Sequence, residues 1–190
     1  MSLRLLSSAA NDSWVSPVES RHAALFCLAL LTVSCALASF ALACATPFVA
    51  FAVIAAAMLP LRAALLVTTG AWLVNQGIGF GALHYPLDAD TMLWGLSIGI
   101  AALAATAVAA AALRLQGRTP FVLALALLCG YGAYELVLFA ATPFLGGAGS
   151  FSAAIVGRIG LTNVAWLIGL VAACEIVRLV RGASEYRARA

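Results

Sequence analysis

Long apolar runs separated by short polar segments dominate the chain from residue 23 onward. The first run, Ala23 to Leu61, contains no charged residue and is about twice the ~20 residues that one membrane-spanning helix needs. Thr46-Pro47 is the natural place for this run to fold back, because proline lacks a backbone N–H and disfavours helix in the residue before it. The pattern therefore predicts one span over about 23–43 and a shorter one over about 47–60.

Four further apolar segments follow, over about 63–80, 92–113, 121–142 and 161–180. Each should be a helix, because a single span in hydrocarbon satisfies its backbone only as a helix, and no strand-like alternation suggests a barrel. The sequence thus predicts an all-α, polytopic membrane bundle of six transmembrane helices over 23–180, with polar tails over 1–22 and 181–190. A long Gly- and Ser-rich loop is expected between the last two spans.

The composition agrees with a membrane protein. Residues are 65% hydrophobic and 9% charged, whereas a soluble domain carries roughly 25% charged residues. Such a chain has too little charge to cover a water-facing surface. No basic run interleaved with aromatic residues is present, so nucleic acid is not an expected partner; the lipid bilayer is.

The arginines predict the orientation, since basic residues favour the cytoplasmic side. With six spans, Arg158 falls alone on one side, and the other side receives nine: Arg4, Arg21, Arg62, Arg114, Arg118, Arg178, Arg181, Arg187 and Arg189. We therefore expect a multi-pass protein of the bacterial inner (plasma) membrane with both termini in the cytoplasm.

The first span has a second interpretation. Ala43-Cys44-Ala45 resembles the small-residue cleavage site of a secretory signal peptide. The polar segment before it is long for a signal peptide, which favours a retained span. A five-span chain that has lost the first span would keep every later loop on the same side of the membrane. The arginines therefore support the orientation more strongly than they support retention of the first span.

The stretch from Trp72 to Trp94 is the most chemically specific part of the chain. It carries two adjacent amides, Asn75 and Gln76, within a span, and a polar loop with a histidine, a tyrosine and two aspartates. Polar side chains inside a bilayer are costly unless they face protein or water, and they are functional hypotheses by default.

Other polar residues are expected at the same depth, in the outer half of the membrane, at about 1.5 Å per helical residue. Helical spacing lets three spans turn a polar, aromatic face toward one point, which predicts an outward-opening cavity. The candidate ligand-binding residues are Asn75, Gln76, Trp94, Tyr131, Tyr134, Glu135, Asn163 and Trp166. The outer-loop candidates are His84, Tyr85, Asp88, Asp90 and Arg158.

Each candidate also has a structural explanation. The tryptophans are typical of an interfacial aromatic belt, the two amides of hydrogen bonds between helices, and the loop residues of a solvated turn. Glu135 is the hardest to explain in this way, because a carboxylate inside a span costs roughly 2.5–3.5 kcal/mol. Its structural explanation is a salt bridge to Arg158. Gly95 and Gly99, four residues apart, are typical of close helix packing, either within the bundle or at a docking face for another subunit.

Several common enzyme and metal motifs are missing from the sequence. It has no H-E-x-x-H, C-x-x-C or Walker loop, and we predict neither an enzyme nor a metal site or cofactor. The five cysteines are expected to act as small apolar residues. A channel would place polar groups through the whole thickness, but the inner half here is almost purely apolar.

In its size, six spans, cytoplasmic termini, Ala-rich helices and polar outer loops, the chain resembles the substrate-binding subunit of energy-coupling-factor vitamin transporters. The resemblance implies uptake of a small vitamin-like solute, with a coupling membrane subunit and paired ATPases as partners. It also implies ligand contacts from the eight candidates named above. The third span has no cysteine and the N-terminus is not His-rich, so cobalamin-type and nickel or cobalt members are not indicated. An aromatic, nitrogen-containing vitamin would suit tryptophan and tyrosine stacking beside a carboxylate.

The alternative is a non-transporting membrane subunit that serves assembly or acts as a scaffold. In that case the polar residues only hold helices together.

Overall fold

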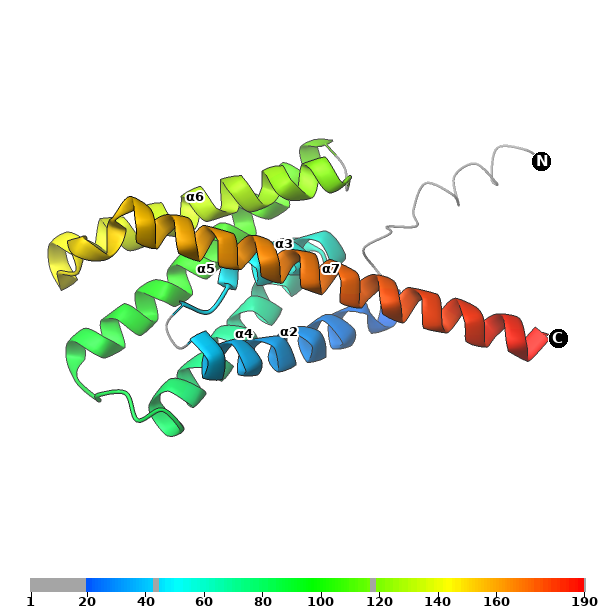
Figure 1. Ribbon diagram of the computed structural model, residues 1–190, viewed down its shortest axis with the longest axis horizontal. Coiled ribbons are helices and arrows are strands. Elements are labelled where there is room, and N and C mark those ends of the chain that lie inside the picture. Colours follow the sequence, from blue (N-terminus) through cyan, green and yellow to red (C-terminus); the bar gives the residue numbers. More distant parts are fainter. Residues whose placement is uncertain (1–19, 43–44, 117–118, 190) are drawn as a thin grey trace.

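The computed structural model describes residues 20–42, 45–116 and 119–189. These ranges contain six α-helices and a short 3-10 helix. They are α2 (Ser20–Leu42), α3 (Phe48–Met58), α4 (Leu61–Gly81), α5 (Ala89–Gln116), α6 (Pro120–Leu145), η3 (Ala148–Phe151) and α7 (Ala153–Arg189). Figure 1 shows the helices as an elongated bundle. No strand occurs in the part of the chain that is described.

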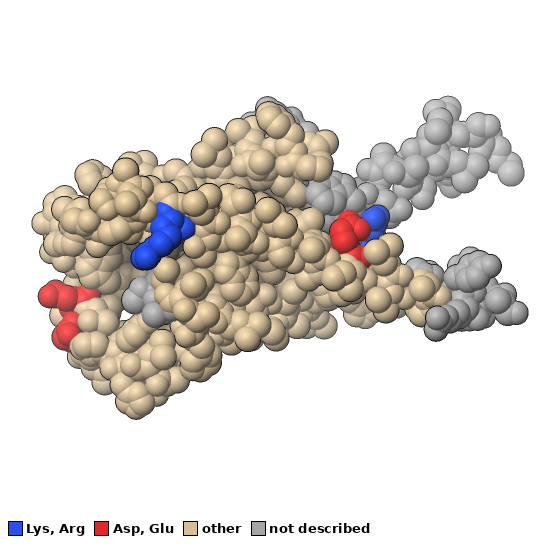
Figure 2. Space-filling model, in the orientation of Figure 1, with Lys and Arg blue, Asp and Glu red and all other residues tan. Residues whose placement is uncertain are grey.

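Five helices (α2, α4, α5, α6 and α7) are long and apolar enough to cross a membrane. Together with α3, they confirm the predicted all-helical membrane bundle. The ends of the bundle differ in charge. We call the end where α4 begins and α5 ends the basic end, because it carries Arg62 and Arg114. The opposite end, where residues 82–88 join α4 to α5, is called the loop end; Figure 2 shows acidic side chains there.

The second predicted span is a short helix in the structure. α3 has 11 residues, or about 16 Å of helix, which is only half of the ~30 Å hydrocarbon core. It begins near the middle of the bundle and ends at the basic end (Figure 1). All of its residues are buried. A helix that is apolar all round has no polar face to expose and belongs in a core.

α3 is the centre of the bundle and packs against all five long helices. Its large side chains Phe48, Phe51 and Ile54 are almost completely buried. α5 lies close to α3 and α6 and contributes buried alanines such as Ala102 and Ala105. Small side chains allow helix backbones to approach closely, and this is the main source of packing between helices in membranes.

The last helix is longer than predicted at both ends. α7 begins at Ala153 and continues to Arg189, so the expected loop over 143–160 reduces to residues 146–152. Gly146 and Gly147 have positive φ angles of 74° and 79°, which glycine adopts without strain, and they end α6. The tail over 1–19 and residues 43–44 of the expected cleavage site lie outside the described residues.

Candidate functional site

The two amides of α4 form hydrogen bonds with protein groups. Asn75 Nδ2 donates to Ser39 Oγ of α2 at 2.8 Å and to Thr46 Oγ1, just before α3, at 3.0 Å. Gln76 Nε2 donates to Asn75 Oδ1 at 3.2 Å. Thr46 is 3% exposed. The amide pair therefore joins α4 to α2 and to the segment that turns back into the bundle.

The same face of α4 packs on two glycines of α5. Trp72 Nε1 donates to the Gly95 carbonyl oxygen at 2.9 Å. A Cβ atom placed on Gly95 would lie 2.5 Å from Gln76 Oε1, and one on Gly99 would lie 2.7 Å from the Trp72 ring. The prediction that Gly95 and Gly99 serve packing within the bundle is confirmed.

Asn163 caps the buried helix α3 from a different helix, α7. The first N–H groups of any helix have no acceptor within it. Asn163 Oδ1 accepts the Ala50 N–H in the first turn of α3 at 3.0 Å, and its Nδ2 donates to the Ile159 carbonyl oxygen at 3.0 Å. The side chain is 2% exposed. One turn further along α7, Trp166 packs edge-on against Phe51 with ring centroids 6.1 Å apart.

Tyr131 and Glu135 lie one turn apart on α6, where this helix meets α7. The Tyr131 hydroxyl donates to the Val156 carbonyl oxygen at 2.6 Å, and its ring passes Gly160 so closely that a Cβ there would lie 3.3 Å from it. Glu135 is half-buried and its carboxyl interacts with the Tyr131 hydroxyl. Tyr134, on the same helix, is 5% exposed and belongs to the core.

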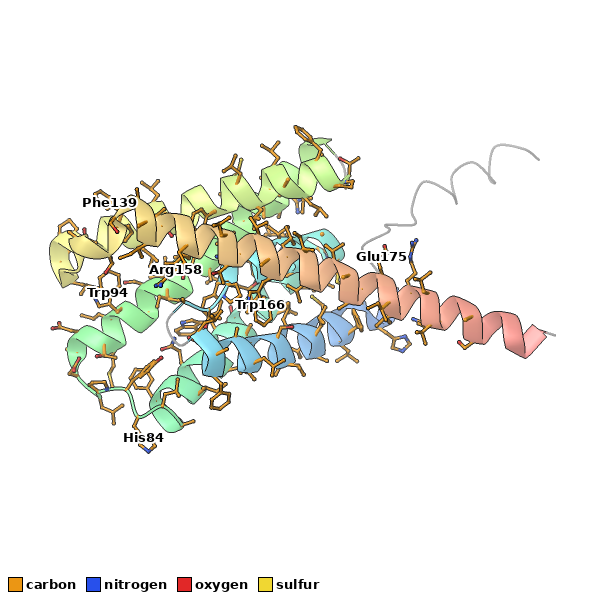
Figure 3. All side chains as sticks on the ribbon, viewed as in Figure 1. His84, Trp94, Phe139, Arg158, Trp166 and Glu175 are labelled. Atoms are coloured by element: carbon orange, nitrogen blue, oxygen red, sulfur yellow. The ribbon has the colours of Figure 1, made fainter. Side chains whose placement is uncertain are left out.

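Arg158 does not form the salt bridge considered for Glu135. It is exposed, and neither it nor Glu135 has an ion-pair partner in the described part of the chain; Arg178 and Glu175, near the other end of α7, pair at 2.7 Å. Figures 2 and 3, in the same orientation, place Arg158 at the edge of a hollow in this face of the molecule. An unpaired guanidinium offers five hydrogen-bond donors.

The loop between α4 and α5 is held by local contacts. His84 has a φ of 55° and its Nδ1 lies 3.0 Å from the Ala82 carbonyl oxygen. Tyr85 packs over Gly79 and edge-on to Phe80, so it belongs to the end of α4 rather than to solvent.

The two aspartates of this loop lie at the start of α5. Asp88 Oδ1 accepts the Thr91 N–H at 2.8 Å, as a helix cap does. This hydrogen bond from the Thr91 backbone holds the pKa of Asp88 below its ordinary value. Asp90 is exposed in the first turn, where the helix dipole favours negative charge. Trp94, in the next turn, packs against Gly147 of the other loop.

The candidates thus fall into separate groups of contacts, one between α4, α2 and α5, one around the start of α3, one between α6 and α7, and one at the loop end. Sequence reasoning missed Ser39 and Thr46 as partners of Asn75. The signals were present: Thr46 stands at the predicted chain reversal, and Ser39 follows Cys35 at helical spacing.

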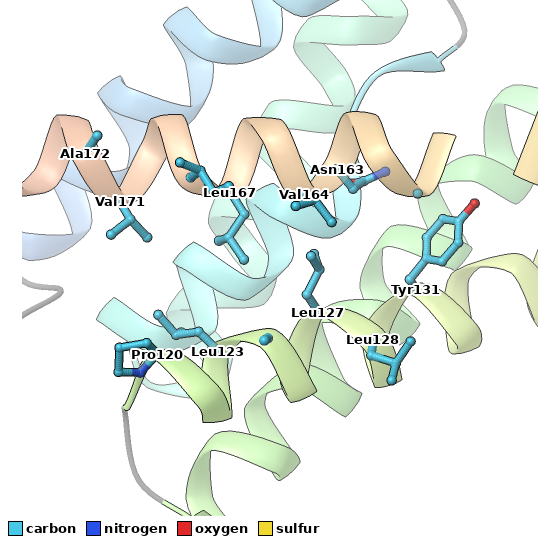
Figure 4. Close-up of a pocket in the computed structure, with 13 residues that line it drawn as sticks. Pro120, Leu123, Leu127, Leu128, Tyr131, Asn163, Val164, Leu167, Val171 and Ala172 are labelled. Atoms are coloured by element: carbon cyan, nitrogen blue, oxygen red, sulfur yellow. The ribbon is translucent and has the colours of Figure 1, made fainter. Parts of the chain in front are cut away.

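Sequence reasoning also missed a groove between α6 and α7, with a volume of about 700 Å³ (Figure 4). Its walls are almost entirely aliphatic. Of the predicted site residues, Tyr131 and Asn163 line it, at one end.

Groups of three or more His, Cys, Asp or Glu side chains that could hold a metal do not occur among the described residues. Cys27, Cys35 and Cys174 are buried as free thiols. The Cys35 thiol donates to the Ala71 carbonyl oxygen at 3.0 Å, which ties α2 to α4.

Comparisons with protein-family models, with curated proteins and with solved structures found no match.

Proposed function

We propose that this protein is a membrane subunit that captures a small, vitamin-like solute from the side of the membrane facing the loop end. Energy for uptake would come from a coupling membrane subunit with ATPases. The basic end faces the cytoplasm of a bacterial cell, in keeping with the positive-inside rule. The substrate-binding subunits of energy-coupling-factor transporters, which this sequence resembles, would act in this way.

The proposal depends on one observation. Two side chains of opposite charge, Glu135 and Arg158, lie within spans and have no ion pair with a described residue. Glu135 lies about 15 Å before the loop end of α6, and Arg158 about 8 Å after the start of α7. Because charges inside spans are costly and mark ligand pathways, a solute reaching this region would meet both a carboxyl group and an unpaired guanidinium.

The interrupted second span adds support. Transporters commonly build solute sites where a discontinuous helix starts inside the membrane. Here α3 starts in the middle of the bundle, with Asn163 and Trp166 at its first turns.

A second candidate function is that of a non-transporting scaffold or assembly subunit. The hydrogen bonds of Asn75 and Asn163 favour it, because both amides hold helices together without any ligand. In addition, no buried side-chain nitrogen or oxygen atom of the described residues lacks a hydrogen-bond partner.

The two functions separate when Glu135 is replaced by Gln, which keeps the shape of the side chain and removes the charge. Purified wild-type and E135Q protein are heated with each member of a panel of water-soluble vitamins, and the shift in Tm is measured. Capture predicts that at least one vitamin raises the Tm of the wild type, and that E135Q folds but loses most of this shift.

The control is Glu175→Gln, at the basic end, where the carboxylate is already paired with Arg178. It should keep the full ligand-induced shift. If E135Q binds like the wild type, or no vitamin shifts the wild type, the scaffold function stands. Copurification of an ATPase pair with the tagged wild-type chain would support uptake independently.

A further inference from the structure

The groove between α6 and α7 shares only Tyr131 and Asn163, at one end, with the candidate solute-binding residues. Its 13 lining residues include Leu123, Leu127, Leu167 and Val171, and its two walls splay apart toward the basic end (Figure 4). Beyond the groove, toward the loop end, Tyr131 of α6 bonds to Val156 of α7, and Phe139 of α6 packs on Phe151 of η3 with centroids 5.4 Å apart.

The groove covers one half of the membrane. Along α6 it extends from Pro120 at the basic end to Tyr131, which is about 16 Å at 1.5 Å per residue. One leaflet contributes about half of the ~30 Å hydrocarbon thickness, or ~15 Å. The groove is therefore about as long as the acyl chains of one leaflet, and it lies on the side of the leaflet at the basic end.

A transmembrane helix from another protein fits this groove less well. Such a helix needs the whole thickness of the bilayer, but the groove closes at Tyr131 and Gly160, where α6 and α7 touch. Close helix contacts also require small residues, whereas most of the lining side chains here are leucine, valine and isoleucine.

The charges around the mouth suit a phospholipid headgroup. The open end of the groove lies at Pro120 and Ala172. Arg178 follows Ala172 about 9 Å further along α7. Arg114 is exposed in the last turn of α5, the helix that precedes α6. Glu175 is the acidic residue of this stretch and is already paired with Arg178. Basic pockets on the cytoplasmic side of membrane helices attract anionic headgroups.

We propose that this groove binds one phospholipid of the leaflet at the basic end. An acyl chain lies between α6 and α7, and the phosphate lies near Arg114 and Arg178. The lipid then fills the space between two helices that otherwise touch only near the loop end. This binding is independent of the proposed solute site.

Ala124 and Ala172 line opposite walls of the groove. The variants Ala124→Phe and Ala172→Phe test whether a lipid binds there. Ala140→Phe is the control, since Ala140 is exposed on α6 outside the groove. Each full-length chain is purified in detergent, and phospholipid per chain is measured by native mass spectrometry. The stripped proteins are then reloaded from vesicles of phosphatidylglycerol or of phosphatidylcholine.

The expected result is about one retained phospholipid in the wild type and in A140F, with preference for phosphatidylglycerol on reloading. Retention in A124F and A172F should fall roughly tenfold or more, because displacing only two methylene groups already weakens binding that much. If a Phe variant fails to fold, Ala124→Leu replaces it.

Equal retention in all variants would show an ordinary lipid annulus and overturn the proposal. So would a wild-type dimer that becomes monomeric only in the groove variants, since the groove would then hold a second copy of the chain. Equal reloading with both lipids would overturn the headgroup assignment and leave the acyl-chain site.

Discussion

Single polar side chains join the helices of this apolar chain to one another. Asn163 is the clearest case. Its Oδ1 accepts the N–H of Ala50, in the first turn of a helix that begins inside the bundle, and this hydrogen bond is buried. An unpaired backbone N–H at this position would cost much more than the same group at a surface. Asn75 has a similar role between α4, α2 and the segment before α3.

Replacing Asn163 with Ala should therefore lower the free energy of unfolding by about 1–3 kcal/mol, since it leaves the Ala50 N–H buried without an acceptor. Denaturation of the purified protein in mixed micelles measures this. Thr162→Ala is the matched control: that hydroxyl is bonded to its own helix, at the Arg158 carbonyl oxygen, and its loss should change stability by less than about 0.5 kcal/mol. Equal effects of both changes would contradict the capping role.

The Asp88 cap gives a pH-dependent prediction. Its pKa is lowered because the charged carboxylate accepts the Thr91 N–H. The cap is therefore fully formed above the ordinary aspartate pKa and is lost as the pH falls through the lowered value. As the pH falls through this lowered pKa, the rate of hydrogen exchange at the Thr91 amide should rise relative to the intrinsic rate of an unprotected amide.

Asp88→Ala should raise this exchange at neutral pH, whereas Asp88→Asn should restore protection, because Asn caps helices as well as Asp. Unchanged exchange in the Ala variant would show that the amide is protected by other contacts.

At the scale of the helices, the contact between α4 and α5 shows how glycines determine the distance between two helices. The Trp72 ring occupies the space that a side chain at position 99 would need, and the Gln76 amide occupies the space that one at position 95 would need. The helices are held at this distance by a hydrogen bond from Trp72 to Gly95 and by one between Thr106 and Thr68 at 3.2 Å. Any side chain on these glycines would push the two helices apart.

Gly99→Ala should destabilise the protein by about 1–3 kcal/mol through overpacking. Gly77→Ala, on α4, is the matched control, since no atom lies within 4 Å of a Cβ placed there. This change should be neutral or stabilising, because alanine is favoured over glycine in a helix by about 1 kcal/mol. Thermal unfolding of both variants tests the contact; a neutral Gly99→Ala would mean that the Trp72 ring moves away without cost.

For the whole molecule, the six described helices run alternately away from and toward the basic end (Figure 1). α2 begins and α7 ends at the same end of the bundle (Figure 1), although α3 is too short to cross the membrane alone. Thr46 and Pro47, just before α3, are buried in the protein. Non-helical backbone is tolerated at membrane depth only where protein surrounds it.

The orientation is testable with single added cysteines in a chain in which the exposed Cys129, and Cys44 from outside the described residues, have been replaced by Ala. In intact bacterial cells, a membrane-impermeant maleimide should label Leu87→Cys, in the exposed loop, within minutes. Ser184→Cys, in the exposed last turns of α7, should react only after the cells are opened. The reverse pattern would place the basic end outside.

Much of the fold could be predicted from the hydrophobic pattern, because a run of about 20 apolar residues in a bilayer has only the helix available to it. The pattern located six helices and the glycine pair of α5. It also gave the bounds of α3 closely, since Pro47 and Pro60 limit a segment predicted over about 47–60 and found over Phe48–Met58. By contrast, it extended the 143–160 loop too far, because glycines such as Gly157 are compatible with both loop and membrane helix.

The candidate site was less predictable. Position along a helix follows from residue number, so it could be expected from sequence that Asn75 lies near the loop end of its helix. Which way a side chain points, and what it meets, depends on the rotation and crossing of the helices. For that reason the bonds of Asn75 to Ser39 and Thr46, and the separation of Glu135 from ion pairing, required the tertiary structure.

By itself, then, the sequence determined that this protein is a helical membrane bundle, where its helices lie along the chain, and that one end is basic. These properties follow from local hydrophobicity and charge. The tertiary structure alone decided that the short second helix is buried on all sides and capped by Asn163, and that α6 and α7 leave a groove between them. These features arise from contacts between residues far apart in the sequence, which no local pattern encodes.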